Sequence, residues 1–565
     1  MPAHQEIVAC KIHPGIGIAR VGNSPNHYFI GPEAPGVNRP PRGGYKDAGD
    51  PSRGVPPRVK RQGARFRIFG YDGAGRMARE MTAGEVEITW TVHLANEKAE
   101  WFEFRGRDGE NRPPKAPRRN RTVKDRNSLI IDPGERTITG PNQSAQFTGG
   151  EFMGIPVPLG EIRTDREGRL LALGGFGKSG TSDPKRLITT YANNDRWYDD
   201  VSDGPVTARV TLKDGRQLPV TPSWVIVAPP DFAPATTNLV TLYDVAIEAA
   251  IARGWMQPPE RPSFTEHIYP IFARTALLQW VQKRTLAGHG PDADEHANFF
   301  LILDMLADNQ PEQEELRRHI FGHLRDPNAK GAAAEMTANE SFMPLLSGDD
   351  GDKTPGQPGT WFTLTKTQYA MMRQWAEGEF EADWQGAPAP STKVTPQGLD
   401  RAALENCAGG AFFPGIEASW VMRNSTLYAE PFRLDHQQLT PGDITKHSAV
   451  PWQADFFECR EHWWPAQRPD EVLTFDTYEQ IQQLDSELSK LNPKSKKFAN
   501  LKVQRDALWR YREPWARGLP DSSPEGDRAM VTEWSRMGFL VNQLEDGTPL
   551  MLNGEPQIVE TERNE

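Results

Sequence analysis

The sequence predicts an α+β protein in which a β-rich N-terminal part, residues 1–235, precedes a helical and loop-rich C-terminal part, residues 236–565. Two observations predict this order. Before residue 235 apolar and polar residues alternate in several segments, a period of two that is typical of half-buried strands. After residue 236 the apolar residues recur every three to four positions, as in amphipathic helices. We expect these two parts to be separate domains that meet at the proline-rich segment Ala228–Pro234.

The composition excludes some classes of function. The net charge is −11 over 565 residues, which disfavours nucleic acid as a partner because phosphate binding needs a basic surface. No run of eighteen apolar residues occurs, so we expect no membrane span. The N-terminus lacks the basic and apolar regions of a conventional signal peptide. We therefore expect a cytoplasmic protein, or one exported without a conventional signal peptide.

Four segments of the N-terminal part predict strands. They are Arg65–Phe69, Val86–Leu94, Val206–Leu212 and Trp224–Val227, and turn sequences separate them. Together they indicate a mostly antiparallel sheet or sandwich. The basic segment 102–128 is predicted to be a solvated connection, since runs of like charge usually face water.

A glycine-rich motif in this part fits a nucleotide-binding pattern but lacks its context. Gly73–Ala78 matches G-x-G-x-x-A, yet the strand at Val86 follows too soon for a crossover helix. We interpret the motif as a hairpin turn. Neither the G-x-S-x-G elbow of hydrolases nor a phosphate-binding P-loop occurs in the chain.

The C-terminal part predicts seven helices from apolar stripes, caps and stops. They are Leu242–Ala250, Asn298–Asp308, Pro311–Arg325, Thr365–Glu377, Leu399–Asn406, Tyr478–Leu491 and Phe498–Arg512. The last two indicate a helical pair joined by a lysine-rich turn. His319 and His323 share a helix face at the spacing of metal ligands, but a surface or packed pair is the better interpretation.

The segment Pro451–Asp470 concentrates chemistry-bearing residues. It contains Cys459 among aromatic residues, with Asp455 four positions before it and His462 three after it. A lone buried cysteine is most often inert packing. Burying a carboxylate beside it is costly unless the carboxylate has a role, and a helix would place Asp455 and Cys459 on one face.

Two further places could supply what Cys459 needs. Cys407 precedes a glycine-rich aromatic turn that ends at Glu417, which on its own indicates a helix stop with a buried thiol. Trp534 lies in a short segment that ends at Gly538 and on its own would be a core residue. With only three cysteines and no C-x-x-C pair, neither a disulfide framework nor a zinc site is expected.

These pieces together resemble a known family, the quinoprotein amino-acid oxidases typified by L-lysine ε-oxidase and the related glycine oxidase. The resemblance spans nearly the whole chain. It is carried by Ile16–Ser24, Tyr28–Glu33, Lys60–Arg67, Trp90–Asn96, Phe412–Glu417, Asp455–Cys459 and Trp463–Asp470. Long strings in the same order make chance similarity improbable.

The resemblance implies a cofactor made from the protein itself, cysteine tryptophylquinone, and no metal. Cys459 would give the thioether and Trp534 would become the quinone, while Asp455 would match the acid required for making the cofactor. Trp509 and Trp515 lie nearer to Cys459 in sequence and stay alternatives to Trp534. Further residues would neighbour the active site with unassigned roles, namely Cys407, Glu417, His462 and Trp463.

The resemblance also implies a reaction. An amino acid, such as lysine at its ε-amine, glycine or a similar amine, would be oxidised by O2 to an aldehyde or oxo-acid, ammonia and hydrogen peroxide. A quinone accepts an amine and two electrons, which no genetically encoded side chain does. Asp455 is the candidate base. The implied partners are a flavoprotein that oxygenates the tryptophan and further copies of the chain, with no nucleic acid or membrane.

Two alternative interpretations have simple tests. A non-catalytic β-rich binding or scaffold relative that kept the fold would be colourless and would not stain for quinone. A metal hydrolase would contain bound metal on elemental analysis.

Overall fold

The structure is a computed structural model that describes most of the chain. The described residues are 6–36, 40–101, 118–294, 297–348, 352–354, 357–358, 360–410, 418, 421–458, 460 and 463–564. Three residues singled out by the sequence, Glu417, Cys459 and His462, lie outside the described residues. Within the described ranges, no helix is both long and apolar enough to cross a membrane.

A large sheet forms the N-terminal part, with 14 strands among the described residues. Its main path runs through β7 (Arg136–Thr139), β6 (Val86–Val92), β15 (Ser202–Leu212), β18 (Ser223–Ala228), β2 (Ile16–Arg20), β4 (Arg61–Asp72), β12 (Leu170–Leu173), β11 (Glu161–Thr164) and β8 (Ser144–Gln146). The strands β1 (Ile7–His13), β3 (Tyr28–Ile30), β5 (Met77–Met81), β16 (Gln217–Leu218) and β17 (Val220–Thr221) pair beside this path. The first and last strands of the path, β7 and β8, contact each other, so the sheet curls.

The predicted strands are confirmed, with bounds that differ by a few residues. Most pairs are antiparallel, as expected, but β18 runs parallel to β2, β1 to β17 and β3 to β4. Every residue of β18 is buried, which fits a central strand covered on both faces. The turn at Gly73–Ala78 joins β4 to β5 as an antiparallel hairpin, so the hairpin interpretation of that motif is also confirmed.

Several predicted helices are confirmed, and two of them begin with a capping box. Thr241 and Asp244 make a capping box at α2 (Leu242–Ala252), and Thr365 and Gln368 make another at α8 (Lys366–Ala376). The remaining confirmed helices are α9 (Pro396–Glu405), α11 (Phe475–Leu488) and α12 (Lys496–Arg510).

Two predicted helices are shorter than the sequence indicated. The segment 298–308 holds η5 (Phe299–Leu301) and α5 (Leu303–Ala307), separated at Ile302, whose φ of −117° and ψ of 16° are not helical. The segment 311–325 holds η6 (Pro311–Gln313) and α6 (Glu314–Gly322). The sequence patterns did not predict α3 (Tyr269–Leu277), α4 (Lys283–His289), α7 (Ala332–Met336) or α13 (Glu525–Glu533).

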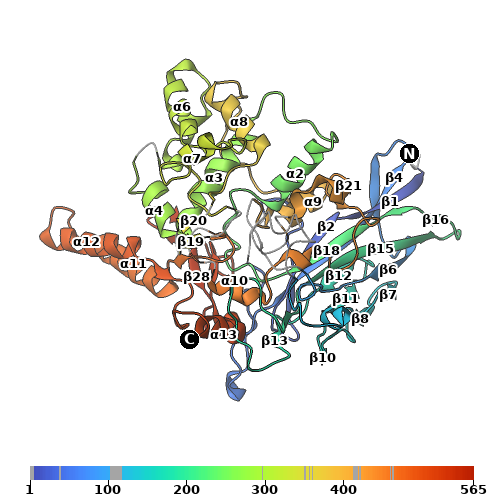
Figure 1. Ribbon diagram of the computed structural model, residues 1–565. Helices are drawn as coiled ribbons and strands as arrows, with labels where there is room; N and C mark the ends of the chain where they lie inside the picture. Colours follow the sequence, from blue (N-terminus) through green and yellow to red (C-terminus); the bar gives the residue numbers. More distant parts are fainter. Residues whose placement is uncertain are drawn as a thin grey trace.

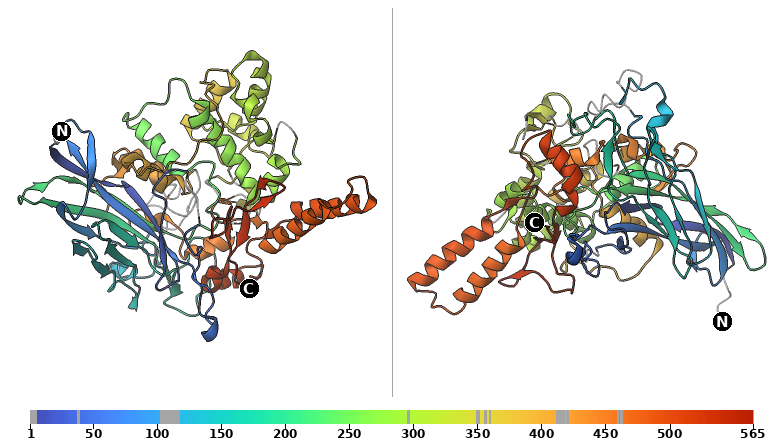
Figure 2. Two further views of the ribbon diagram at one scale, coloured as in Figure 1. Left: turned by 180° about the vertical axis from the view of Figure 1, so that it is seen from behind. Right: turned by 90° about the horizontal axis from the view of Figure 1, so that it is seen from below.

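The helical part packs against the sheet, and one helical hairpin extends away from the body. Figures 1 and 2 show α11 and α12 side by side, projecting from the molecule on the side away from the sheet. The buried cluster takes in residues from both parts, including Trp224 of the sheet and Trp375 and Trp464 of the helical part. The large sheet ends at Ala228 and α2 begins at Leu242, and the division at residue 235 stays a prediction.

Candidate active site

A short buried helix, α10 (Trp452–Glu458), carries Asp455 and is followed directly by Cys459 in the sequence. The first six residues of α10 are buried, and Asp455 is 3% exposed. Aromatic residues account for this burial. The Phe457 ring fills the space beside Gly526, where a Cβ would lie 1.8 Å from its Cζ. The helix that the sequence predicted conditionally around Asp455 is therefore present.

Trp534 lies against α10 at the end of a second helix. It begins η10 (Trp534–Arg536), which follows α13, and α13 packs on α10. The Trp534 side chain is 4% exposed, and its ring centroid lies 5.4 Å from that of Trp452 at an interplanar angle of 69°. This is the edge-to-face arrangement that aromatic rings prefer. Asp455 and Trp534, 79 positions apart, thus come from helices in contact.

The two alternative tryptophans are engaged elsewhere. Trp515 donates from Nε1 to the carbonyl of Gly538 at 3.0 Å, and its ring stacks obliquely on Phe232 at 4.9 Å. Trp509, in α12, donates to Gln557 at 3.2 Å. Trp534, by contrast, packs its ring directly on an aromatic ring of α10.

Buried polar groups of the N-terminal part fix the start of α10. The Asp199 carboxylate accepts hydrogen bonds from the backbone N–H of Trp452 at 3.1 Å and from Lys98 Nζ at 2.8 Å. Lys98 Nζ also donates to the carbonyl of Ala449 at 2.8 Å. Both side chains of the ion pair are at most 1% exposed. A carboxylate is well placed at a helix N-terminus because unpaired N–H groups point towards it.

Two more buried side chains hold the segment that leads into α10. Arg119 Nη1 donates to the carbonyl of Ser448 at 3.0 Å, and Asn194 Nδ2 donates to that of Val450 at 3.0 Å. The prediction that segment 102–128 is a solvated connection is therefore wrong at Arg119, which is 2% exposed. The reason is that these buried carbonyls lie outside any strand or helix and need donors.

A buried lysine near α10, Lys98, interacts electrostatically with two acids, Asp199 and Asp455. Burial lowers the pKa of the Lys98 ammonium, while Asp199 and Asp455 act in the opposite direction. The Lys98 ammonium is therefore attracted to both carboxylates. Asp455 thus lies in the field of a positive charge supplied by the N-terminal part.

A second pair of acids bridges α10 and α13. Ser523 Oγ donates to Asp527 Oδ2 at 2.5 Å and lies 3.5 Å from Glu458 Oε1. Burial, followed by repulsion from Asp527, raises the pKa of Glu458 to about 7. Burial also raises the pKa of Asp527. Ser523 lies between the two carboxyl groups, and the raised pKa of Glu458 makes this bridge depend on pH near neutrality.

A glycine-rich loop between β12 and β13 (Ser179–Thr181) lies against a further acid, Asp200, and against Trp534. A Cβ on Gly175 would be 2.4 Å from Asp200 Oδ2, and one on Gly177 would be 2.2 Å from Trp534 Cζ2. This loop was not predicted as part of the site. Its signal is three glycines within four positions, which indicates close backbone approach.

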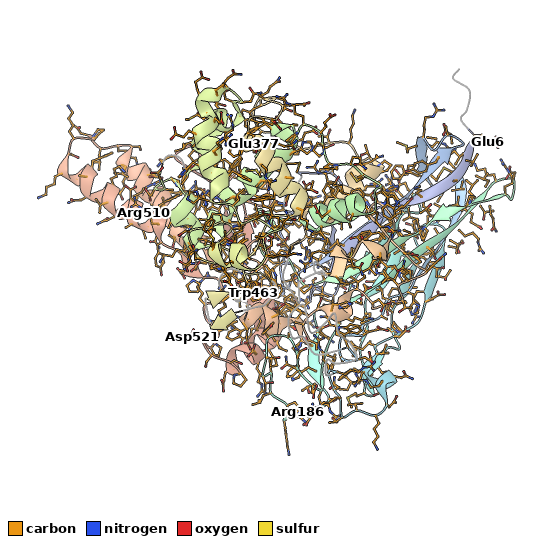
Figure 3. All side chains as sticks on the ribbon, turned by 45° about the horizontal axis from the view of Figure 1, so that its top comes forward. Glu6, Arg186, Glu377, Trp463, Arg510 and Asp521 are labelled. Atoms are coloured by element: carbon orange, nitrogen blue, oxygen red, sulfur yellow. The ribbon has the colours of Figure 1, made fainter. Side chains whose placement is uncertain are left out.

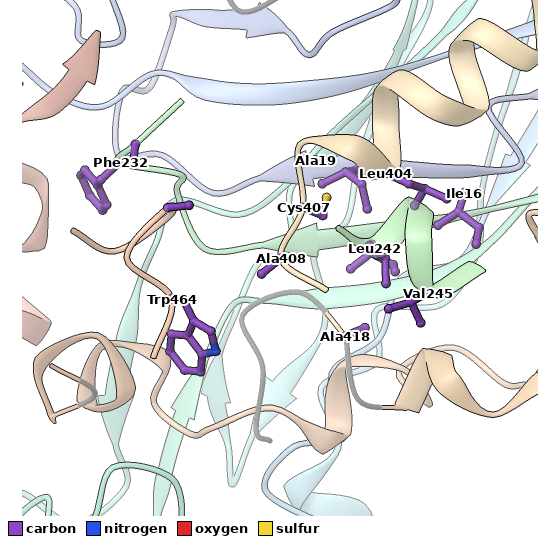
Figure 4. Packing of buried hydrophobic residues seen from close by; sticks show 14 of the residues in the cluster. Ile16, Ala19, Phe232, Leu242, Val245, Leu404, Cys407, Ala408, Ala418 and Trp464 are labelled. Carbon is purple, nitrogen blue, oxygen red and sulfur yellow. The ribbon is translucent and has the colours of Figure 1, made fainter. Parts of the chain in front are cut away.

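The remaining predicted neighbours are in other surroundings. Cys407 is 1% exposed and packs with Ile16, Leu242 and Leu404 in the core, and its thiol donates to the carbonyl of Ala403 at 3.3 Å (Figure 4). Its local environment is that of a helix stop with a buried thiol. Trp463 is 5% exposed, with its ring 5.9 Å from that of Trp464, and lies near the middle of the molecule in Figure 3.

The described residues provide no metal-binding cluster of three or more His, Cys, Asp or Glu side chains. His319 and His323 have ring centroids 4.7 Å apart, and His323 Nδ1 lies 2.9 Å from the carbonyl of His319. A cavity of about 1090 Å³ beside α12 is lined by Trp280, Trp509 and Arg510. Neither Asp455 nor Trp534 lines it, so the tryptophan site is separate from this hollow.

Comparison with known proteins identifies the family of the chain. A family model described as L-lysine epsilon oxidase N-terminal matches residues 13–227, and one described as L-lysine epsilon oxidase C-terminal domain matches residues 344–476. L-Lysine 6-oxidase of Marinomonas mediterranea is 30% identical over an alignment of 543 residues that covers 80% of this chain and 71% of that protein. The chain belongs to the L-lysine epsilon-oxidase family.

Solved structures agree with this family. The epsilon-lysine oxidase from Marinomonas mediterranea matches with a TM-score of 0.75 and 25% identity, covering 98% of this chain and 95% of that chain. The Schiff base intermediate of that organism's L-Lys epsilon-oxidase with L-Lys matches with a TM-score of 0.74, the same identity and the same coverage. The α+β fold class predicted from the sequence is confirmed.

Proposed function

We propose that this member of the L-lysine epsilon-oxidase family deaminates an amino acid oxidatively through a cysteine tryptophylquinone made from Cys459 and Trp534. Family membership makes the chain an amino-acid oxidase. The observation that carries the proposal is the packing of Trp534 on α10, the helix that ends one residue before Cys459. The products are an aldehyde or oxo-acid, ammonia and hydrogen peroxide.

The residues around Trp534 fit such a group. Its ring is almost fully buried, which excludes water from the reacting edge, and Trp452 holds it from one side. At its Cζ2 edge the ring meets Gly177, a residue without a side chain. When formed, the quinone supplies the electrophile and the two-electron acceptor that the encoded side chains lack.

Asp455 is the proposed proton acceptor, both in making the cofactor and in the reaction. Its helix is fixed by Asp199 and Lys98, so the carboxyl group is held by the N-terminal part of the protein. The Lys98 ammonium attracts this carboxylate, and an ionised carboxylate can take a proton. Burial of Asp455 keeps bulk water from competing for that proton.

The substrate, the partners and the location are further parts of this proposal. The named relatives act on L-lysine, so the lysine ε-amine is the first candidate, followed by glycine and similar amines. Maturation requires a flavoprotein that oxygenates the tryptophan with O2, and the chain assembles with further copies of itself. It acts in the cytoplasm or is exported without a conventional signal peptide.

A panel of amino acids tested with peroxide detection decides the function. The chain is co-expressed with its flavoprotein partner, alongside Asp455→Ala, Trp534→Phe and the control Trp509→Phe. We expect peroxide from at least one amino acid with the wild type and the control, and loss of both turnover and quinone absorption in the other two. A colourless wild type with no turnover on any amine would favour a scaffold, and full colour in Asp455→Ala would refute the role of that acid.

A further inference from the structure

The backbone at Gly177 approaches the benzo edge of Trp534 so closely that no side chain fits between them. A Cβ atom on Gly177 would lie 2.2 Å from Cζ2, 2.9 Å from Cη2 and 3.0 Å from Cε2. A point straight above Cζ2 would lie closer to both flanking carbons, and a point in the ring plane would lie farther from both, so this point is outward from Cζ2 and out of the ring plane. Real Cβ atoms essentially never come within 3.0 Å of a heavy atom, so only glycine keeps this space open.

This space borders the place that an oxygen on the ring would take, so the two cannot both be filled. An ortho-quinone needs oxygen on two neighbouring benzo carbons, and Cζ2 and Cη2 are such a pair. A carbonyl bond is about 1.23 Å long, so an oxygen on Cζ2 that points away from the ring would lie well inside contact distance of a Cβ on Gly177. We infer that Gly177 is a positioning residue that reserves room for the oxygen on Cζ2 of Trp534, an inference that rests on the proposed function.

Anchors on both sides hold the loop at this distance from the ring. Gln453, a fully buried residue of α10, donates from Nε2 to the carbonyl of Gly177 at 3.2 Å and accepts from Ser179 Oγ at 2.6 Å. The Asp200 carboxylate accepts the backbone N–H of Lys178 at 3.0 Å. The loop is thus tied to α10 and to the segment just before β15, so the spacing to Trp534 is fixed before any oxygen is added.

Glycine is also required at this position by its backbone. Its φ is +69°, in the left-handed region that other residues rarely adopt. Each ring C–H that becomes C=O exchanges one hydrogen for one oxygen, with the flavoprotein and O2 named above supplying the oxygen and taking up the electrons. Gly177 forms no bond in these steps. It determines whether the oxygenated ring fits where the unmodified ring lay.

The test compares two glycine substitutions that share the backbone cost and differ in the clash. Gly215 has a φ of +88°, and a Cβ added to it would meet no described atom within 4 Å, so Gly215→Ala is the control for left-handed strain. Wild type, Gly177→Ala and Gly215→Ala are each co-expressed with the flavoprotein and weighed intact. We expect two oxygens gained and four hydrogens lost in the wild type and the control. In Gly177→Ala the fraction with both oxygens should fall about tenfold or more.

A folding control separates this effect from misfolding. Gly177→Ala made without the flavoprotein should unfold cooperatively. If it does not, Gln453→Ala replaces it, since that change releases the loop without adding atoms and should leave ring products with fewer than two oxygens. Full oxygenation of a folded Gly177→Ala, or of Gln453→Ala in its place, would overturn the inference. A wild type that never gains oxygen at Trp534 would instead overturn the proposed function.

Discussion

The helix α10 and the α11–α12 hairpin represent opposite ways of building a helical segment. α10 has only seven residues, yet its first six are buried, and buried polar groups of the N-terminal part fix its start. The hairpin has two long helices that project from the body, and Val503 on its surface is 70% exposed. Sequence periodicity identifies the hairpin easily, whereas the short helix depends on contacts with residues far away in the chain.

This difference assigns the two regions different roles. Helices shorter than about 12 residues are marginal alone, so α10 exists because tertiary contacts stabilise it. Those contacts also fix Asp455, which is what a reacting group needs. The hairpin lies between Cys459 and Trp534 in the sequence, inside the loop that the proposed cross-link would close. Changes at the anchors of α10 should therefore have large effects, and changes on the hairpin small ones.

The largest expected effect is that of the covalent tie. A thioether between Cys459 and Trp534 closes a loop of about 75 residues, which by chain entropy restricts the unfolded state by about 4–5 kcal/mol. Thermal unfolding of the mature protein should occur well above that of the same chain made without the flavoprotein, with or without thiol reductant. Equal melting temperatures would mean that no tie forms or that the enclosed segment stays folded during the transition.

Removing the buried cation should come next. Lys98→Ala leaves the Asp199 carboxylate buried without its partner, at a cost of about 3–5 kcal/mol. Denaturant unfolding measures it, and Lys98→Met with Asp199→Leu should recover much of the loss because neither charge is left alone. If Lys98→Ala is as stable as the wild type, the ion pair does not anchor α10.

A smaller and pH-dependent effect is expected at the bridge between α10 and α13. The pKa of Glu458 is raised to about 7, so the folded state binds its proton more tightly than the unfolded state, whose carboxyl has a pKa of about 4.5. Its contribution is therefore present at low pH and is lost as pH rises from about 4.5 through about 7. Over this pH range Glu458→Gln should lose about 1 kcal/mol less stability than the wild type, after allowance for solvent screening.

Melting curves of wild type and Glu458→Gln between pH 5 and pH 8 isolate the contribution of Glu458 and its interaction with Asp527, because the acids far from this bridge titrate equally in both. The variant should become relatively more stable as pH rises. Parallel pH profiles would show that folding does not raise the pKa of Glu458.

The smallest effect is expected on the hairpin. Lys502 and Asp506 form an exposed i,i+4 ion pair at 2.7 Å, and such pairs contribute about 0.3–0.5 kcal/mol. Lys502→Ala should therefore lower stability by no more than that, with turnover unchanged. A loss of several kcal/mol in the same denaturant assay would show that the hairpin contributes to stability as much as the anchors of α10 do, which contradicts the proposed difference between the two regions.

The sequence predicted the features that depend on local pattern. Alternation at Val86–Val92 predicted a strand, the apolar stripe at Leu242–Ala250 predicted a helix, and the cap Thr365 predicted a helix start. In these cases the physical cause lies within a few residues of the feature that it determines.

The features that the sequence did not reveal join distant residues. Lys98 bonds a carboxylate 101 positions away and a carbonyl 351 positions away, and Gly177 touches a ring in the C-terminal part. An isolated lysine or glycine carries no local signal of such a contact. The prediction for Arg119 was wrong for the same reason, because its carbonyl partner at Ser448 belongs to another part of the chain.

The central claim is that Cys459 and Trp534 form one cofactor, and peptide mapping by mass spectrometry tests it most directly. The mature protein, co-expressed with its flavoprotein partner, is denatured, alkylated and digested. We expect one cross-linked pair of peptides joining Cys459 to Trp534, with two oxygens gained and four hydrogens lost. Complete alkylation of Cys459, or a link from it to Trp509 or Trp515, would contradict the claim.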